Sequence, residues 1–284
     1  MPAGAVRTAR LHDGSYHRPA AQKVRIKRLV VATPTLSGET KVNKILTGRI
    51  DPSRIRSISI PRPSEGVLAR YRALGDATCA VSDALDDLGI RGAVAASTLV
   101  PTIAGARIIG TALTLRNSVR QEDPMVTLSR KDNRMAEIEC HNLAEAGDVL
   151  VIQGAAGVSN MGGIGTKIGK RQGEAGAIVD GGIRDVAQSR ALCYPIWSTE
   201  RTPITGKWRL EAIEINGPVL ICGIRVEPGD LVVADDTGVC FVPRDRITDV
   251  LLFAERKTKE EEDKGAQVDC GDSVPDLAGR KITA

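Results

Sequence analysis

After residue 66 the hydrophobic positions change repeatedly between strand-like and helix-like spacing. Buried strands are predicted by "ARIIGTALTLRN", "DVLVIQG" and "AIVDGG", and two short strands around a turn by "GDLVVADDTGVCFVP". Helices are predicted by "DATCAVSDALDDLGI", "MAEIECHNLAEAG" and "GIGTKIGKRQGEAG", each closed by glycine or a polar turn. A last helix in "DRITDVLLFAERKTKEEEDKG" would pack through Ile247, Val250, Leu251 and Ala254. Strands that alternate with helices predict an α/β domain.

Residues 1–65 lack this patterning, and we interpret them as a basic, poorly patterned N-terminal extension. The α/β domain would cover 66–264 and a C-terminal tail 265–284. Residues 1–60 contain 12 Lys and Arg against 3 Asp and Glu, whereas the remainder contains 27 against 32. Such a leader is typical of a solvated extension, a transit peptide, a nucleic-acid contact or sequence upstream of a misplaced start. Tyr16 is its one aromatic residue, which argues against nucleic acid.

The composition indicates a globular protein without membrane spans, and the cysteines indicate the compartment. Hydrophobic residues make up 42% and charged residues 26%, as in ordinary globular proteins, and no apolar run is long enough for a membrane span. The six cysteines form no CxxC pair and none has a histidine at zinc-ligand spacing. Without a recognisable secretory signal, we expect a cytoplasmic protein with no membrane partner.

Several familiar catalytic motifs are absent. The "GK" at 169–170 has Ile164 where a phosphate-binding loop needs glycine and Arg171 where it needs a hydroxyl. The dinucleotide pattern would need glycine at Ile168. There is no G-x-S-x-G, and His141 lies on an amphipathic helix where packing or exposure accounts for it. A lysine Schiff base stays open, although no lysine lies in an apolar strand.

Residues 148–185 carry the most informative arrangement. One strand ends at Gly154, a glycine-rich loop enters a helix near Gly163, and the next strand ends at Asp180 shortly before Arg184 and Asp185. If the strands are parallel, the amides at the helix start face the edge from which these two side chains emerge. Helix-start amides and a guanidinium bind carboxylates, and one carboxylate can anchor a water-rich magnesium ion. The pattern favours a site for a 2-oxo acid, although a solvated ion pair in a turn would also explain it.

The spacing of Gly163, twenty residues and then Arg184-Asp185 resembles the G-x20-R-D signature of the regulator of ribonuclease activity A (RraA-like) family. That family includes class II 4-hydroxy-4-methyl-2-oxoglutarate/4-carboxy-4-hydroxy-2-oxoadipate aldolases. The stretches "SDALDDLGIRG", "AEAGDVLVIQG", "EAGAIVDGGIRDVAQSRALCYPIW" and "GDLVVADDTGVCFVP" support the resemblance in order and spacing. It spans roughly residues 70–260 and leaves out the first 65.

The resemblance implies a swivelling β/β/α fold, assembled as a homotrimer or hexamer with sites near subunit boundaries. It implies that Arg184 and Asp185 are catalytic and that Asp185 is the ligand of a divalent metal, Mg²⁺ or Mn²⁺. Substrate would be bound by Arg184 and by the backbone of a glycine turn composed of Gly162, Gly163, Ile164 and Gly165. Because the resemblance begins after residue 65, residues 1–60 are predicted to be dispensable for assembly and catalysis.

Two positions depart from the family pattern. Aldolase members commonly have Asp or Glu where this chain has Gly163, and the ribonuclease-regulator pattern has Glu or Asp where this chain has Gln188. We therefore predict a metal-dependent lyase that cleaves a carbon–carbon bond of a 2-oxo acid and releases pyruvate. It would act on an aldol substrate, on oxaloacetate by decarboxylation, or on both, with decarboxylation less dependent on an acid at 163. The alternative is a non-catalytic protein that binds and regulates a ribonuclease.

Overall fold

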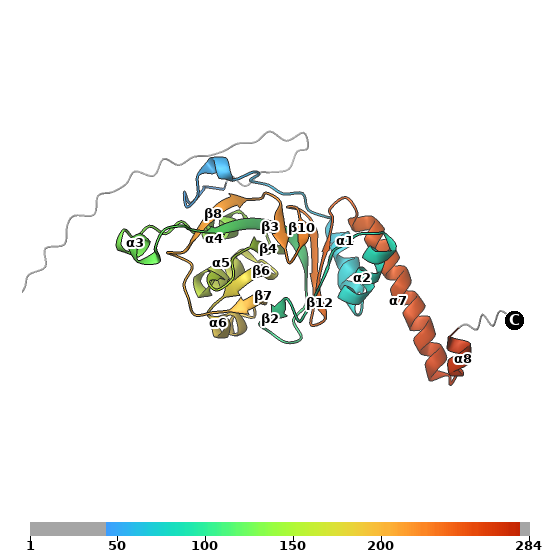
Figure 1. Cartoon of the computed structure of the whole chain (residues 1–284). Coiled ribbons are helices and arrows are strands. Elements are labelled where there is room, and N and C mark those ends of the chain that lie inside the picture. The colour runs from blue at the N-terminus through green and yellow to red at the C-terminus, as the bar shows by residue number, and fades with distance from the viewer. Residues whose placement is uncertain (1–43, 279–284) are drawn as a thin grey trace, which may run out of the picture.

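A computed structural model describes residues 44–278, whose largest element is a mixed ten-stranded sheet with helices packed on it (Figure 1). Its strands and a separate hairpin, β9–β10, are β1 (Ala93–Ala95), β2 (Val100–Pro101), β3 (Ile108–Val119), β4 (Asp148–Gln153), β5 (Ser159–Met161), β6 (Gly176–Ile183), β7 (Ile196–Arg201), β8 (Leu210–Ile215), β9 (Val219–Ile221), β10 (Ile224–Val226), β11 (Leu231–Ala234) and β12 (Gly238–Val242). The helices are η1 (Pro52–Arg54), α1 (Glu65–Ala73), α2 (Ala77–Asp87), α3 (Pro124–Ser129), α4 (Glu137–Leu143), α5 (Gly163–Gln172), α6 (Val186–Ala191), α7 (Ile247–Asp269) and α8 (Val274–Leu277).

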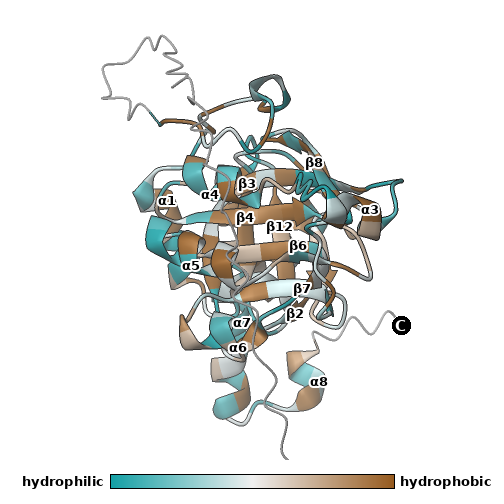
Figure 2. Cartoon of the chain, turned by 90° about the vertical axis from the view of Figure 1, so that its left-hand side faces the viewer, coloured by the Kyte–Doolittle hydropathy of each residue, from teal (hydrophilic) through white to brown (hydrophobic). Residues whose placement is uncertain are grey.

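The central strands are apolar on both faces because both faces are covered. In β4, Leu150 and Ile152 belong to a core that also includes residues of α4, whereas Val149 and Val151 belong to a second core shared with β9 to β12. A two-sided burial of this kind explains why "VLVI" is a continuous apolar run instead of an alternating one. Figure 2 shows the same central strands as bands of hydrophobic colour.

A third core lies on the opposite side of β11 and β12, where α1, α2 and α7 pack. Val81 and Leu85 of α2 meet Val250 and Leu251 of α7, and Val233 of β11 closes the cluster. Helices α4 to α6 lie on one side of the central strands, and α1, α2 and α7 lie on the outer side of β11 and β12. These layers of helices and sheet form an α/β architecture, so the predicted fold class is confirmed.

Parallel pairing brings the carboxyl ends of the central strands to one edge of the sheet. β3, β4, β6 and β7 are neighbours in that order and all three pairings are parallel. The loops that leave β4 and β6 therefore emerge together, which is what the sequence predicts for residues 148–185. We refer to this side as the carboxyl edge.

The predicted elements are present, with one boundary in error. Strand β6 does not end at Asp180 but continues through two glycines to Ile183, while Asp180 Oδ2 accepts a hydrogen bond of 2.7 Å from Cys222 N of the β9–β10 turn. A Cβ on Gly181 would lie 2.5 Å from Asn160 Nδ2 and 2.8 Å from Ala155 O, so only glycine lets the strand continue there. The Asp180 side chain therefore points toward the β9–β10 hairpin.

Residues 44–64, which we term the N-terminal strap, pack on the α/β body. Ile50 and Ile60 are buried in the core beneath α4. The fully buried carboxylate of Glu139 accepts hydrogen bonds from Thr47 N (2.8 Å) and Gly48 N (3.1 Å). These contacts argue against the predicted dispensability of residues 1–60 as far as residues 44–60 are concerned; residues 1–43 lie outside the described chain.

The end of the strap is held by an ion pair. The Arg62 guanidinium makes two hydrogen bonds with Asp148, from Nε to Oδ1 at 2.9 Å and from Nη2 to Oδ2 at 2.8 Å. Asp148 is the first residue of β4 and is buried. Two-point pairing of this kind fixes orientation as well as distance, so the strap is joined to a central strand.

Within residues 44–278, no helix combines the length and the apolar character that crossing a bilayer requires.

Candidate functional site

Arg184 and Asp185 lie at the carboxyl edge, directly after β6. Their backbone is fixed there because Arg184 N donates to Met161 O of β5 at 3.2 Å. Helix α5 begins at Gly163, two residues after β5, so its first turn lies beside the end of β6. The structure thus brings together all the residues that the sequence predicts for the site.

The Asp185 carboxylate points toward the first turn of α5. Its Oδ2 accepts a hydrogen bond from Gly163 N at 2.7 Å and lies 3.5 Å from Arg184 Nε. Its backbone is left-handed, with φ 58° and ψ 38°, a conformation that aspartate tolerates better than most residues. Among the described residues Oδ1 has no hydrogen-bond partner, and 44% of the side chain is exposed. One oxygen is thus held in place while the other can bind a ligand.

The glycine turn needs glycine because side chains approach its backbone closely. A Cβ on Gly162 would lie 3.0 Å from both Arg184 Nε and Asp185 Oδ2. A Cβ on Gly165 would lie 3.1 Å from His141 Nε2. Ile164 instead points outward and is 68% exposed. The turn therefore offers backbone amides rather than side chains to a bound anion.

The residues present fit a singly anchored divalent cation. The described residues contain no group of three His, Cys, Asp or Glu side chains that could enclose a metal. Magnesium, however, often keeps most of its water and binds through one or two carboxylates and substrate oxygens. The unpartnered Oδ1 of Asp185, beside the glycine turn, meets that requirement.

A side chain introduced at position 163 would contact Gln188. The φ of Gly163 is not positive, so a side chain causes no backbone strain, but its Cβ would overlap Oε1 of Gln188 and lie 3.2 Å from Asp185 Oδ2. Gln188 is on α6 and its flexible end can turn aside. The two positions at which the chain departs from the family pattern are therefore in contact.

We expect the double variant Gly163→Asp/Gln188→Ala to raise aldol cleavage relative to oxaloacetate decarboxylation. Aldol cleavage must remove a hydroxyl proton and decarboxylation need not, and general-base assistance is worth about 10²–10⁴-fold, so a gain of about 10-fold is expected even from an imperfectly placed acid. Steady-state rates on both substrates measure the ratio. Gly163→Ala/Gln188→Ala is the matched control, and an equal ratio in the two variants would refute this account of Gly163.

A buried polar network supports the back of α5, and the sequence did not reveal it. His141 Nδ1 lies 2.8 Å from Glu174 Oε1, and the Tyr194 hydroxyl donates to Glu174 Oε2 at 2.6 Å. Burial, together with the Glu174 carboxylate, raises the pKa of Tyr194 well above its usual value. All three side chains are buried, so His141 has the packing role that the helical pattern allows. Only tertiary structure brings these three positions together.

The sequence also missed the residues at the end of β7. Arg201 is the last residue of that strand and pairs in register with Ile183 of β6, so it emerges at the carboxyl edge beside Arg184. A hollow of about 410 Å³ lies between the two strand ends, from Ile183 to Val186 and from Arg201 to Pro203. No strand was predicted at 196–201, so no signal pointed to it.

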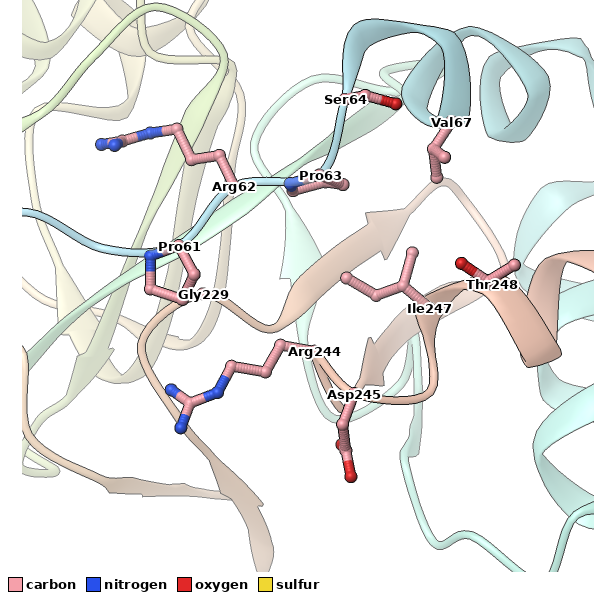
Figure 3. Close-up of a pocket in the computed structure, with 10 residues that line it drawn as sticks. All are labelled: Pro61, Arg62, Pro63, Ser64, Val67, Gly229, Arg244, Asp245, Ile247 and Thr248. Carbon is pink, nitrogen blue, oxygen red and sulfur yellow. The ribbon is translucent and has the colours of Figure 1, made fainter. Parts of the chain in front are cut away.

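A second cavity, of about 340 Å³, lies between the strap and the start of α7 (Figure 3). Of its two arginines, Arg62 extends away and pairs with Asp148, whereas the Arg244 guanidinium makes one hydrogen bond, from Nη1 to Pro228 O at 2.8 Å. The rest of the lining is largely apolar, including Pro61, Val67 and Ile247. Unlike the carboxyl edge, this cavity contains none of the residues that the sequence predicts for the site.

Comparison with known proteins identifies the family to which the chain belongs. Residues 78–241, more than half of the chain, match the RraA-like family described as Aldolase/RraA. A Halalkalibacterium halodurans protein named "Putative 4-hydroxy-4-methyl-2-oxoglutarate aldolase" is 32% identical over 187 residues, which cover 65% of this chain and 81% of that protein. Protein DlpA of Legionella pneumophila is 30% identical over 182 residues, 63% of this chain; the match spans only 28% of DlpA.

Solved structures show the same fold. An uncharacterized protein from Pseudomonas syringae aligns with a TM-score of 0.64 and 25% identity, covering 77% of this chain and 99% of its own. Streptomyces coelicolor RraAS2, described as an unusual member of the RNase ES inhibitor RraA protein family, aligns with a TM-score of 0.58 and 29% identity, covering 71% and 96%. The predicted RraA-like swivelling β/β/α fold is confirmed.

Proposed function

Because this chain belongs to the RraA-like family, we propose that it is a divalent-metal-dependent carbon–carbon lyase that acts on 2-oxo acids and releases pyruvate. The observation that supports the proposal is the hydrogen bond from Gly163 N to Asp185 Oδ2, which places a carboxylate with one free oxygen against a helix start, beside Arg184. The aldolase names of several relatives point to the same chemistry for those proteins.

In this proposal the chain's residues bind and orient the substrate. The free amides of the glycine turn and the Arg184 guanidinium would hold the substrate carboxylate. Asp185 would hold Mg²⁺ or Mn²⁺, which when bound draws electrons into the 2-oxo group. The bond between C3 and C4 of the substrate would break, its electron pair would form the enolate of pyruvate, and Arg184 would stabilise the negative charge; in aldol cleavage the C4 hydroxyl proton would pass to solvent. Solvent protonates the enolate, and CO₂ or an oxo acid is the second product.

The residues favour decarboxylation over aldol cleavage. Loss of CO₂ from oxaloacetate needs electron withdrawal alone, whereas aldol cleavage needs a base for the hydroxyl proton. No carboxylate occupies position 163, and the neighbouring Gln188 is not a base. We propose oxaloacetate decarboxylation as the faster reaction, in a cytoplasmic homotrimer or hexamer.

A substrate panel tests the proposal. Purified protein is incubated with oxaloacetate or with 4-hydroxy-4-methyl-2-oxoglutarate, with Mg²⁺ or with excess chelator, and pyruvate is measured against a metal-only blank. We expect pyruvate from oxaloacetate above the blank, lost with chelator and restored by added Mg²⁺. Pyruvate formation no faster than in the metal-only blank with both substrates would reject the proposed lyase activity.

A ribonuclease regulator is the second candidate, favoured by the likeness to RraAS2. A regulator that works by docking would inhibit a ribonuclease without any need for the free oxygen of Asp185. Inhibition of RNase E-type cleavage that is unchanged in Asp185→Asn, with no lyase activity in either protein, would favour this candidate.

A further inference from the structure

Helix α5 packs on the buried polar network of His141, Glu174 and Tyr194 through a face that carries two glycines. A Cβ on Gly165 would lie 3.1 Å from His141 Nε2. A Cβ on Gly169, about one turn of helix further on, would lie 2.6 Å from Glu174 Oε2. His141 therefore lies against the first turn of α5 and Glu174 against the next. Because Gly165 belongs to the glycine turn, His141 lies directly behind the backbone that would bind a substrate carboxylate.

The network fixes the proton on one ring nitrogen of His141 but not on the other. Glu174 Oε2 accepts a hydrogen bond of 2.6 Å from the Tyr194 hydroxyl, and Glu174 Oε1 lies 2.8 Å from His141 Nδ1. An ionised carboxylate only accepts hydrogen bonds, so Nδ1 carries a hydrogen and donates it to Glu174. His141 Nε2 is buried and has no partner within residues 44–278. Whether Nε2 carries a proton therefore depends on the charges around it.

A proton on Nε2 would make the His141–Glu174 pair a dipole parallel to that of helix α5. The positive ring would lie at the start of the helix and the carboxylate toward its end. A positive charge near a helix start is unfavourable by itself, whereas an anion bound there is favourable. An anion on the glycine turn offsets the charge of the ring, and burial of the ring limits screening by salt. Binding of the anion and binding of the proton should therefore favour each other.

We propose that His141 takes up a proton at Nε2 when a substrate carboxylate binds to the glycine turn, and that this charge strengthens the binding. The inference rests on the proposed function, since the glycine turn must hold the carboxylate. His141 lies behind the backbone and acts through helix α5, so it is a positioning residue. At low pH the ring is protonated with or without substrate, and binding is tight. As the pH rises through the range in which histidine titrates, the free protein loses this proton and must regain it on binding, so the affinity falls.

Other titratable groups face His141 and Glu174. Glu137 lies one turn before His141 on α4, its charge interacts with that ring, and burial raises its pKa. Burial also raises the pKa of Cys140 well above its usual value, so this residue stays a neutral thiol. Lys44 interacts with Glu174, and burial lowers the pKa of Lys44. A raised pKa brings the titration of a carboxylate toward neutral pH, so Glu137 requires a control variant.

Calorimetry of pyruvate binding in Mg²⁺ tests the inference. Measurements at about pH 6, 7 and 8, in pairs of buffers with different ionisation enthalpies, give the affinity and the number of protons taken up. The carboxylate of pyruvate is ionised throughout this range. We expect the wild type to bind pyruvate about 10-fold more weakly at the highest pH than at the lowest, a usual size for coupled sites, and to take up protons as it binds.

Two variants distinguish His141 from Glu137. His141→Asn keeps a donor for Glu174 in the place of Nδ1 but has no second ring nitrogen. We expect the affinity of His141→Asn to stay within about 2-fold over the whole pH range, at the weak value that the wild type shows at the highest pH, without proton uptake. Glu137→Gln is the matched control and should show the pH dependence and the proton uptake of the wild type.

Every other outcome contradicts the inference. Wild-type binding that is independent of pH and takes up no proton means that His141 is not coupled to the glycine turn, while the proposed function stands. Proton uptake that persists in His141→Asn, or that is lost in Glu137→Gln, assigns the proton to another group. The wild-type measurements need no variant, so they decide the question even if His141→Asn does not fold. Failure of the wild type to bind pyruvate at any pH overturns the proposed function itself.

Discussion

Replacing Asp185 with alanine is expected to abolish metal-dependent lyase activity while the protein stays folded. Asp185 is the one carboxylate that lines the hollow at the carboxyl edge, and losing a direct metal ligand should exceed the about 10–100-fold effect of losing an outer-shell partner. Its side chain is 44% exposed and caps a single amide, that of Gly163. Loss of such a cap costs about 1 kcal/mol, and alanine in the left-handed backbone at this position adds about 1–2 kcal/mol, which a typical domain tolerates.

Asp185→Asn separates the two roles of this side chain. The asparagine oxygen can still accept from Gly163 N, so helix α5 keeps its cap, but the negative charge that a cation needs is gone. We expect Asp185→Asn to melt close to the wild type and to be as inactive as Asp185→Ala. Thermal unfolding and pyruvate release measure the two effects. Magnesium-responsive turnover in Asp185→Asn would show that the carboxylate acts only as a cap.

Deleting residues 1–60 is expected to cause the largest loss of stability. The deletion removes Ile50 and Ile60 from the core, and the burial of each side chain stabilises the folded protein by about 1.5–3 kcal/mol. It also removes the Thr47 and Gly48 donors from the fully buried Glu139, which keeps Asn142 Nδ2 as its remaining donor, and each hydrogen bond lost by a charged group costs about 1.5–3 kcal/mol. Together these approach the whole stability of a typical domain, so the truncated protein should be insoluble or unfolded.

A shorter truncation provides the control for this prediction. Deleting residues 1–43 keeps every described contact of the strap, and urea unfolding should show a free energy far closer to that of the full chain. A protein lacking residues 1–60 with an unchanged unfolding midpoint would contradict the role assigned to the strap.

The sequence predicted the elements whose signal is local. The strand in "DVLVIQG" and the helix beginning at Gly163 have clear periodicity and glycine boundaries, and the parallel-strand rule then placed Arg184 and Asp185 beside that helix. Strand β7 escaped prediction because its second half, Thr199 to Arg201, is polar and only partly buried. Its register with β6, which brings Arg201 to the hollow, is a tertiary property.

The strap escaped prediction for a related reason. It is held by two buried isoleucines and by hydrogen bonds between residues far apart in sequence, such as Thr47 with Glu139 and Arg62 with Asp148. Isolated apolar residues in an Arg- and Ser-rich segment give no periodic pattern. The basic composition of residues 1–60 therefore concealed the residues that contribute to the core.

The most direct test of the central claim is the initial rate of pyruvate formation from oxaloacetate, measured against free Mg²⁺ concentration with the metal-only rate subtracted. We predict a saturable rise for the wild type, a return to zero with chelator and no rise for Asp185→Asn. A wild-type rate that never exceeds the metal-only blank at any Mg²⁺ concentration, or a rise that is equal in Asp185→Asn, would contradict it.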